Sequence, residues 1–166
     1  MSEESFKFAL KFILRYEGGY VIDTDDPGGE TKSGISKRAY PNLDIAALTD
    51  EQIEAIYYTD YWVANNCHTL PFPIAILFFD GCVNQGVRRA ALSLQRACHA
   101  TEDGIVGPKT MAALQKRFEA NPDCLIRDIA AARGWHYMNI SEKLEEKYGF
   151  GWMRRLLECY KLALVL

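Results

Sequence analysis

The sequence predicts a mainly α-helical protein, and three observations lead to this prediction. Apolar residues recur at helical spacing through several segments, first over residues 6–17. No segment alternates apolar and polar residues over more than a few positions, as a strand with one buried face would. Proline and glycine stand where the helical segments would begin or end. A chain of 166 residues is long enough for one well-buried domain, or for one domain of two lobes.

A first helix is expected from Ser2 or Ser5, either of which can cap it, to about residue 16. Its apolar residues recur at i, i+4 and i+7, and Glu17, at i+11, continues the same face. Gly18 and Gly19 then end the helix. A carboxyl in this position emerges beside the core, where partial loss of water favours its protonated form.

A loop or short extended segment is expected over residues 20–40, followed by helices to the end of the chain. Thr49 caps the next helix, over about 49–62, with Gln52 at the capping-box position. The segment 74–84 is apolar almost all round, which predicts a central buried helix. The remaining helices are expected over 88–100, from Pro108 to about 118, over 123–137, and after the separator Gly149–Gly151 to about 164.

The charge of the chain gives no general attraction to nucleic acid, because the formal net charge is -3. Residues 1–70 carry 6 basic and 12 acidic residues, and residues 71–166 carry 13 and 10. The mildly basic second half suits an anionic polymer such as cell wall. Nucleic acid is therefore not an expected partner, and a monomer is expected.

The start of the chain and its cysteines indicate a protein made in the cytoplasm. The first residues have acids before the apolar positions and lysines among them, unlike a signal peptide. No apolar run approaches the roughly 20 residues of a membrane span. The five cysteines are an odd number without close pairing, which predicts reduced, buried thiols. Action outside the cytoplasm would then need a separate means of release.

Residues 15–35 carry five carboxylates on a glycine-rich stretch directly after the first helix. Hydrolysis of a glycosidic bond needs a protonated acid in an apolar setting and a second group in a polar, wet one. Glu17 fits the first role. The second could be filled from the loop, and a hydroxyl there could position a water; the candidates are Asp23, Asp25, Asp26 and Glu30, with Thr31 and Ser33. The same pattern also fits a capped helix end followed by an acidic surface loop.

Several segments resemble one known family in the same order. They are EGGYVIDTDDPGGETKSGIS (17–36), YPNLDIAALTDEQIEAIYYTDYW (40–62), LPFPIAILFFDGCVNQG (70–86), LQRACHATEDGIVGPKTMAAL (94–114) and FGWMRR (150–155). Together they are similar to glycoside hydrolase family 108, bacterial and phage lysozymes that act as N-acetylmuramidases. The last two segments resemble the family's C-terminal peptidoglycan-binding segment. Nearly all of the chain is covered.

The resemblance implies a lysozyme-like, two-lobed helical domain, with a catalytic part over 1–92 and a peptidoglycan-binding part over 93–166 packed into one compact unit. It implies cleavage of the β-1,4 bond between N-acetylmuramic acid and N-acetylglucosamine. Glu17 would be the general acid, Asp26 would support the developing cation or the water, and Thr31 would orient that water. Asp23 and Glu30 compete for the second role. Whether the reaction retains or inverts configuration depends on a carboxyl separation that sequence spacing does not give.

Substrate contacts are expected from an aromatic face and from amides. Tyr20 follows the predicted acid, Asp23 lies on the loop, and Asn84 and Gln85 end the central helix. Asn84 could instead cap that helix before a glycine. The aromatic residues of 57–62 could line a groove, although such stripes more often belong to the core. The segment DGIVGPKT (103–110) resembles the turn and helix of small peptidoglycan-binding domains, and it could also be purely architectural.

The resemblance also implies a biological role, that of a phage or prophage endolysin for a thin Gram-negative wall. Such a protein would wait in the cytoplasm until a holin-like membrane partner released it to the cell wall or periplasm. Peptidoglycan is the expected partner, and no cofactor or metal is expected.

Two other functions compete with hydrolysis of the glycan. One is a non-catalytic peptidoglycan-binding or secretion-associated protein on the same fold. The other is a thiol or metallopeptidase, because Cys67–His68 and Cys98–His99 place cysteine beside histidine and His136 is a third histidine. Metal-ligand spacing of a known kind is missing from the sequence, which disfavours the peptidase.

Overall fold

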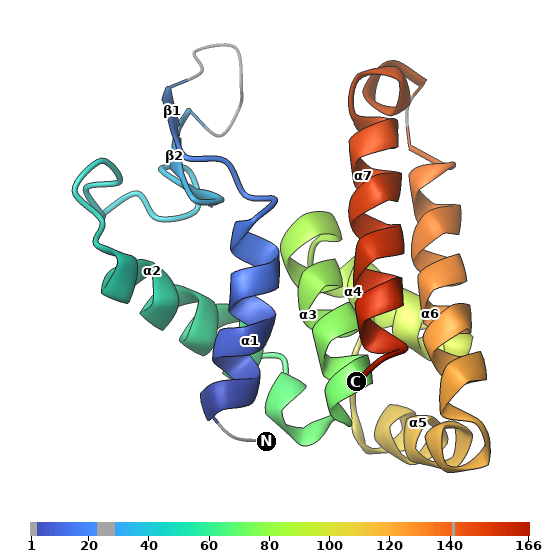
Figure 1. Ribbon diagram of the computed structural model, residues 1–166. Coiled ribbons are helices and arrows are strands. Elements are labelled where there is room, and N and C mark those ends of the chain that lie inside the picture. The colour runs from blue at the N-terminus through green and yellow to red at the C-terminus, as the bar shows by residue number, and fades with distance from the viewer. Residues whose placement is uncertain (1–2, 23–28, 141) are drawn as a thin grey trace. The chain divides into compact units, whose positions relative to one another are not determined.

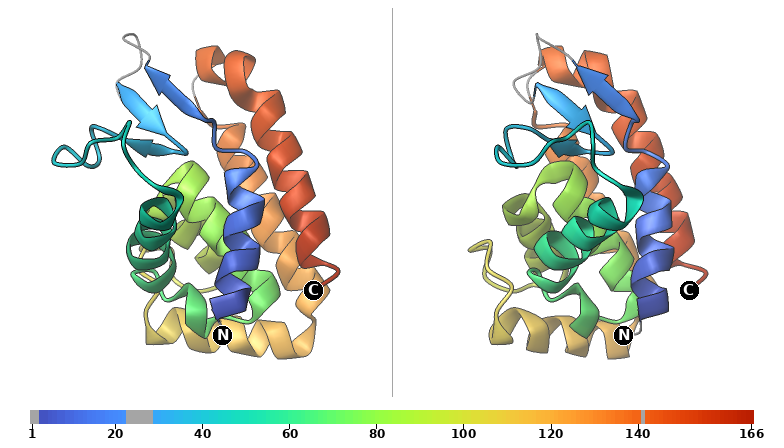
Figure 2. Two further views of the ribbon diagram at one scale, coloured as in Figure 1. Left: turned by 60° about the vertical axis from the view of Figure 1, so that its left-hand side comes forward. Right: turned by 90° about the vertical axis from the view of Figure 1, so that its left-hand side faces the viewer.

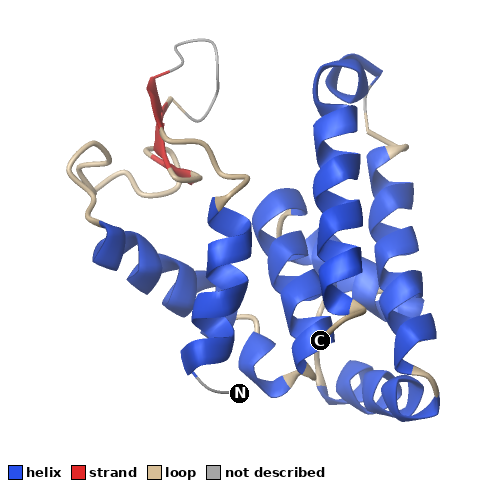
Figure 3. Cartoon of the chain, viewed as in Figure 1, coloured by secondary structure: helices blue, strands red, loops and turns tan. Residues whose placement is uncertain are grey.

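The computed structural model describes residues 3–22, 29–140 and 142–166. Within these ranges it contains seven α-helices and one small three-stranded sheet, so the prediction of a mainly α protein is confirmed (Figures 1 and 3). The chain divides into two compact units, one over Ser2–Ala64 and the other over Asn65–Leu166. Each unit has its own buried side chains and is described by itself.

The first unit begins with helix α1 (Glu3–Leu14), which buries Phe6, Ala9, Leu10, Phe12 and Ile13. Glu3 and Glu4 lie in its first turn, where carboxylates favour the positive end of the helix dipole. Ser5 lies inside the helix and therefore does not cap it, whereas Ser2 lies outside the described residues. The helix ends two residues before the predicted boundary.

The segment after α1 forms an antiparallel sheet of three short strands, β1 (Tyr20–Ile22), β2 (Glu30–Lys32) and β3 (Ile35–Ser36). Tyr20 pairs with Lys32, and Lys32 pairs with Ile35. Ser33 and Gly34 form the two-residue turn between β2 and β3, with φ of 48° and 79°. Positive φ at both positions is typical of a type I′ hairpin turn. The short extended segment predicted here is confirmed.

The first unit continues through α2 (Asp50–Ile56), which begins at the predicted cap. Thr49 accepts from the backbone of Gln52, and the Gln52 side chain accepts from the backbone of Thr49, so the capping box is present. The helix was expected to run unchanged to about residue 62. Instead it becomes the π-helix η1 (Tyr57–Val63), where the hydroxyl of Thr59 donates to the carbonyl oxygen of Ala55 (2.9 Å). That side-chain bond competes with the ordinary backbone bond, which the apolar pattern does not reveal.

The second unit is built on the central helix α3 (Phe72–Gln85), which buries every residue from Ile74 to Cys82. It packs against α4 (Val87–Ala97), α6 (Pro122–Tyr137) and α7 (Glu142–Ala163). The 3₁₀ turn η2 (Cys67–Thr69) precedes it, and α5 (Pro108–Ala120) crosses the start of α6 (Figure 2). The predicted central buried helix is confirmed. In the described part of the chain, no helix is both long and apolar enough to cross a membrane.

Helix α7 corrects one prediction, because Gly149 and Gly151 lie inside it instead of separating two helices. A glycine inside a helix costs only about 1 kcal/mol relative to alanine, which packing can offset. Trp152 provides such packing, since its ring stacks on that of Tyr148 one turn away, with 5.6 Å between the ring centroids. It also stacks on Tyr137 of α6, with 5.4 Å between the centroids. The preceding helix, α6, ends at Tyr137 as predicted.

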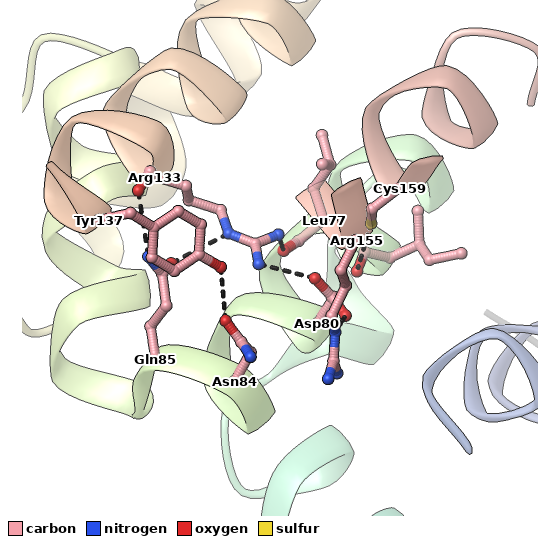
Figure 4. A network of polar contacts seen from close by, with 9 residues as sticks. Leu77, Asp80, Asn84, Gln85, Arg133, Tyr137, Arg155 and Cys159 are labelled. Atoms are coloured by element: carbon pink, nitrogen blue, oxygen red, sulfur yellow. Dashed lines mark hydrogen bonds and ion pairs between the residues drawn. The ribbon is translucent and has the colours of Figure 1, made fainter. Parts of the chain in front are cut away.

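A buried ionic network ties three helices of the second unit together (Figure 4). The fully buried carboxylate of Asp80 on α3 accepts from Arg133 of α6 and from Arg155 of α7, each at 2.7 Å. Arg133 also donates to the carbonyl oxygen of Leu77 (3.0 Å) and to Oε1 of Gln85 (3.0 Å). One carboxylate on α3 therefore forms ion pairs with arginines from two other helices.

Candidate active site

Glu17, the predicted acid, lies three residues after the end of α1 and is half-buried. Its backbone N–H donates to the carbonyl oxygen of Ile13 (3.2 Å), which continues the helical pattern past the end of α1. The next residue, Gly18, accepts through its carbonyl oxygen from the backbone N–H of Ser33 (3.1 Å). The turn that carries Glu17 is thus fixed at one side by the helix and at the other by the β2–β3 hairpin.

Gly34 in that hairpin turn brings two functional groups together. A Cβ added at Gly34 would stand 2.8 Å from Oε2 of Glu17 and 2.7 Å from the hydroxyl oxygen of Tyr57. Side-chain carbon atoms essentially never approach so closely, and the φ of 79° also favours glycine. The carboxyl of Glu17 and the hydroxyl of Tyr57 therefore lie against the same backbone carbon.

Tyr57 is a site residue that the sequence analysis placed only in an aromatic stripe. Its ring is buried in the first unit, as the stripe indicated. Its hydroxyl, however, donates to the carbonyl oxygen of Ser33 (2.9 Å) in the turn beside Glu17. A buried tyrosine needs a hydrogen-bond partner for its hydroxyl, and the β2–β3 turn supplies a carbonyl oxygen for it. This requirement is the signal in the sequence that could have pointed to Tyr57.

Only some of the candidates for the second catalytic group lie among the residues that the structure describes. Asp23, Asp25 and Asp26 lie outside the described residues. Glu30 and Thr31 lie on β2 as neighbours, so their side chains point to opposite faces of the strand.

Tyr20 and Glu30 are joined across the sheet, because the Tyr20 hydroxyl donates to Oε1 of Glu30 (2.7 Å). That hydrogen bond raises the pKa of the Tyr20 phenol. Tyr20 remains 46% exposed, so its ring is open to a ligand on one side. Thr31 lies across from Val21 on one neighbouring strand and from Ser36 on the other.

The part of the chain that carries these residues matches a known family. Residues 10–86, which include Glu17, Gly34 and Tyr57, match the family model described as glycosyl hydrolase 108. Residues 10–86 belong to the glycosyl hydrolase 108 family. Residues 89–157 match the model of a predicted peptidoglycan domain. The family that the sequence resembles is confirmed, and the chain is a glycoside hydrolase with a function related to peptidoglycan.

A solved structure from Brucella abortus, that of SagA, is similar along the whole length of the chain. The sequences are 28% identical, the TM-score is 0.85, and the match covers 99% of this chain and 96% of the other. No curated protein is similar enough in sequence to match.

The two amides at the end of the glycosyl hydrolase 108 match lie in the second unit, on α3. Asn84 accepts a short hydrogen bond from the hydroxyl of Tyr137 (Figure 4). The Gln85 amide donates to the carbonyl oxygen of Arg133 (3.1 Å) and accepts from Nε of the same residue (3.0 Å). Both side chains thus hold α3 against α6, and their contact with substrate stays a prediction.

In the predicted peptidoglycan domain, hydrogen bonds from the side chain of Gln95 hold the turn at Asp103 and Gly104. This fully buried side chain donates to Oδ1 of Asp103 (2.7 Å) and accepts from the backbone N–H of Gly104 (2.8 Å). It also donates to the carbonyl oxygen of Ile105 (3.0 Å) and to the hydroxyl of Thr110 (3.2 Å). These contacts support the architectural interpretation of this motif.

Two of the three histidines considered for a peptidase, His99 and His136, contact arginines. Nε2 of His99 lies 2.7 Å from Arg117, and Nε2 of His136 lies 2.7 Å from Arg89. Because a guanidinium only donates, each arginine occupies the Nε2 lone pair of its histidine. Among the described residues, no three His, Cys, Asp or Glu side chains gather as a metal site would require.

Proposed function

We propose that the chain is a lysozyme that hydrolyses the β-1,4 bond between N-acetylmuramic acid and N-acetylglucosamine, with Glu17 as its general acid. The observation that carries this proposal is the half-buried carboxyl of Glu17, held against Gly34 beside the buried Tyr57. A general acid has to be fixed in place and partly withdrawn from water. The glycosyl hydrolase 108 match supports glycoside hydrolysis, and the peptidoglycan domain supports this polymer as substrate.

For the second catalytic group, we propose Asp26, with Thr31 orienting the water. The main competitor among the described residues is Glu30, and its carboxylate already accepts the hydroxyl of Tyr20. Asp26→Asn should then lose most of the activity, about 10²–10⁴-fold, whereas Glu30→Gln should keep most of it. The opposite result would assign the role to Glu30. Wild-type activity in both variants would point to Asp23.

The bond that is cut can be identified from the products. Purified peptidoglycan is digested with the protein, the products are reduced with borohydride, and the new ends are identified by mass spectrometry. The proposal expects muramitol ends. Glucosaminitol ends would mean the other glycosidic bond, and anhydromuramyl ends would mean that a substrate hydroxyl replaces water. Bound but uncut peptidoglycan would favour a non-catalytic binding protein.

We further propose that the protein serves as a phage or prophage endolysin, made in the cytoplasm and released to the wall by a holin-like partner. A glycoside hydrolase directed at peptidoglycan has its substrate outside the membrane, which supports a separate release step. Expression in Gram-negative cells should leave them intact until the membrane is permeabilised, and then lyse them. Lysis without permeabilisation would contradict this role.

A further inference from the structure

A pocket of about 220 Å³ lies between α4 and α6 in the second unit, inside the predicted peptidoglycan domain. α4 contributes the face that starts at Arg89, and α6 contributes the face that includes His136. The lining positions follow the spacing i, i+3, i+4 and i+7 on α4 and i, i+3 and i+4 on α6, with Asn139 just past the end of α6, so each helix presents one face to the pocket. At about 30 Å³ per water molecule, the volume holds a short chain segment.

One wall of the pocket carries a positive charge that no carboxylate of the described residues balances. Nη1 of Arg89 donates to Nε2 of His136 (2.7 Å), so the imidazole accepts there in its neutral form. Burial and the charge of Arg89 both lower the pKa of His136, which keeps it neutral near pH 7. In the part of the chain that the structure describes, Arg89 forms no ion pair.

The other lining groups leave that single charge in place. Arg96 is matched by Glu102, to which it donates two hydrogen bonds (3.1 and 2.8 Å). Ser93 and Ala132 are buried beneath the opening. Trp135 is 57% exposed, so it presents a large apolar face at the pocket. The pocket therefore combines one unbalanced guanidinium with an exposed aromatic ring.

We propose that this pocket binds a free carboxylate of a peptidoglycan stem peptide, an inference that rests on peptidoglycan as the substrate of the proposed function. The sugars themselves offer little charge, because the lactyl carboxyl of muramic acid is bonded to the peptide. The free carboxylates lie on the stem peptides, where a guanidinium can bind them with two parallel hydrogen bonds. The methyl and methylene groups of the stem would lie on Trp135.

The test titrates the full-length protein with the free tetrapeptide stem, L-Ala–D-Glu–diaminopimelate–D-Ala, and follows the indole N–H signals by NMR. The Trp135→Phe variant identifies the Trp135 signal. The inference expects a saturable shift of that signal and at least about ten-fold weaker binding in Arg89→Gln, the usual effect of losing a hydrogen bond to a charged group. Arg154→Gln is the matched control, because Arg154 is exposed on α7 and does not line the pocket.

Hydrolysis of intact peptidoglycan by the wild-type protein is measured in parallel, so that failure of one proposal can be told from failure of the other. Peptide binding that Arg89→Gln weakens, while Arg154→Gln does not, supports the inference. No saturable shift, equal weakening in both arginine variants, or undiminished binding of a stem whose carboxylates are amidated would overturn it. If intact peptidoglycan is not cut but the peptide binds at Arg89, the hydrolase proposal fails and the pocket stands.

Discussion

Oε2 of Glu17 lies against the Cα of Gly34, so closely that a methyl group on that carbon would stand 2.8 Å from the carboxyl oxygen. A turn that joins two short strands thereby sets the position of the proposed acid. The hydroxyl oxygen of Tyr57 would stand 2.7 Å from the same methyl group. The following predictions test this arrangement and the packing that supports each unit.

Gly34→Ala should reduce activity far more than its effect on stability explains. The positive φ costs about 1–2 kcal/mol for alanine, and the added methyl group must also displace the carboxyl of Glu17. A displacement of this size at a catalytic group reduces the rate about 100-fold. The rate of release of reducing ends and the urea denaturation midpoint are measured for both proteins.

The control for this prediction is Gly86→Ala. Gly86 has a similar φ of 85°, but a Cβ there meets nothing within 4 Å. It should lose at least as much stability from backbone strain, because its ψ of 148° lies in a region that is essentially restricted to glycine, and it should keep its activity. Equal activity losses in the two variants would show that strain alone, without contact with Glu17, explains the effect.

Tyr57→Phe should lower both stability and activity. The substitution keeps the buried ring but leaves the carbonyl oxygen of Ser33 without its donor, at a cost of about 1–3 kcal/mol. It also removes the hydroxyl beside the carboxyl of Glu17, so the pH profile of kcat should shift. Tyr58→Phe is the control, since Tyr58 is exposed on the same π-helix. An unchanged pH profile in Tyr57→Phe would limit Tyr57 to a structural role.

Much of the fold could be predicted from sequence because local signals determine it. The capping box at Thr49, the apolar face of α3 and the proline that opens α5 are all short-range features. The π-helix and the continuous α7 could not be predicted, because each depends on a particular contact, that of Thr59 with Ala55 and that of Trp152 with Tyr137.

The candidate site divides in the same way. Glu17 was predicted from its position in line with the apolar face of the first helix, whereas Asp26 and Thr31 came from the resemblance to a family and stay predictions. Tyr57 was missed because a helical pattern shows that a ring is buried but does not show which group its hydroxyl contacts. The contact between Gly34 and Glu17 joins residues 17 positions apart through a hairpin turn whose geometry becomes visible only once the chain is folded.

Asp80→Asn should strongly destabilise the second unit. The substitution leaves the buried guanidinium groups of Arg133 and Arg155 without a counter-charge, which costs about 3–5 kcal/mol. Asp128→Asn is the control, because Asp128 forms its ion pairs with Arg117 and Arg127 nearer the surface, where such pairs contribute about 0–1 kcal/mol. Urea denaturation measures both, and a small effect of Asp80→Asn would mean that the arginines find other partners.

The cysteines should differ sharply in their reactivity with iodoacetamide. All five are free; Cys124 is partly exposed, and the others are buried. Burial raises the pKa of Cys82 from its usual 9.0 to about 12, so its thiol stays protonated in the fold where the unfolded thiol ionises. Stability from this thiol is therefore present below pH 9 and is lost as the pH rises towards 12. Mass spectrometry at pH 8 should find Cys124 modified first, and rapid labelling of Cys82 would contradict its burial.

The most direct test of the central claim is the rate at which Glu17→Gln releases reducing ends from peptidoglycan. The control is Glu4→Gln, which changes an exposed glutamate of α1 in the same way. If Glu17 is the general acid, its variant should stay folded and lose about 10²–10⁴-fold in rate, while Glu4→Gln keeps the wild-type rate. A folded Glu17→Gln protein that cuts the glycan at the wild-type rate would contradict the account.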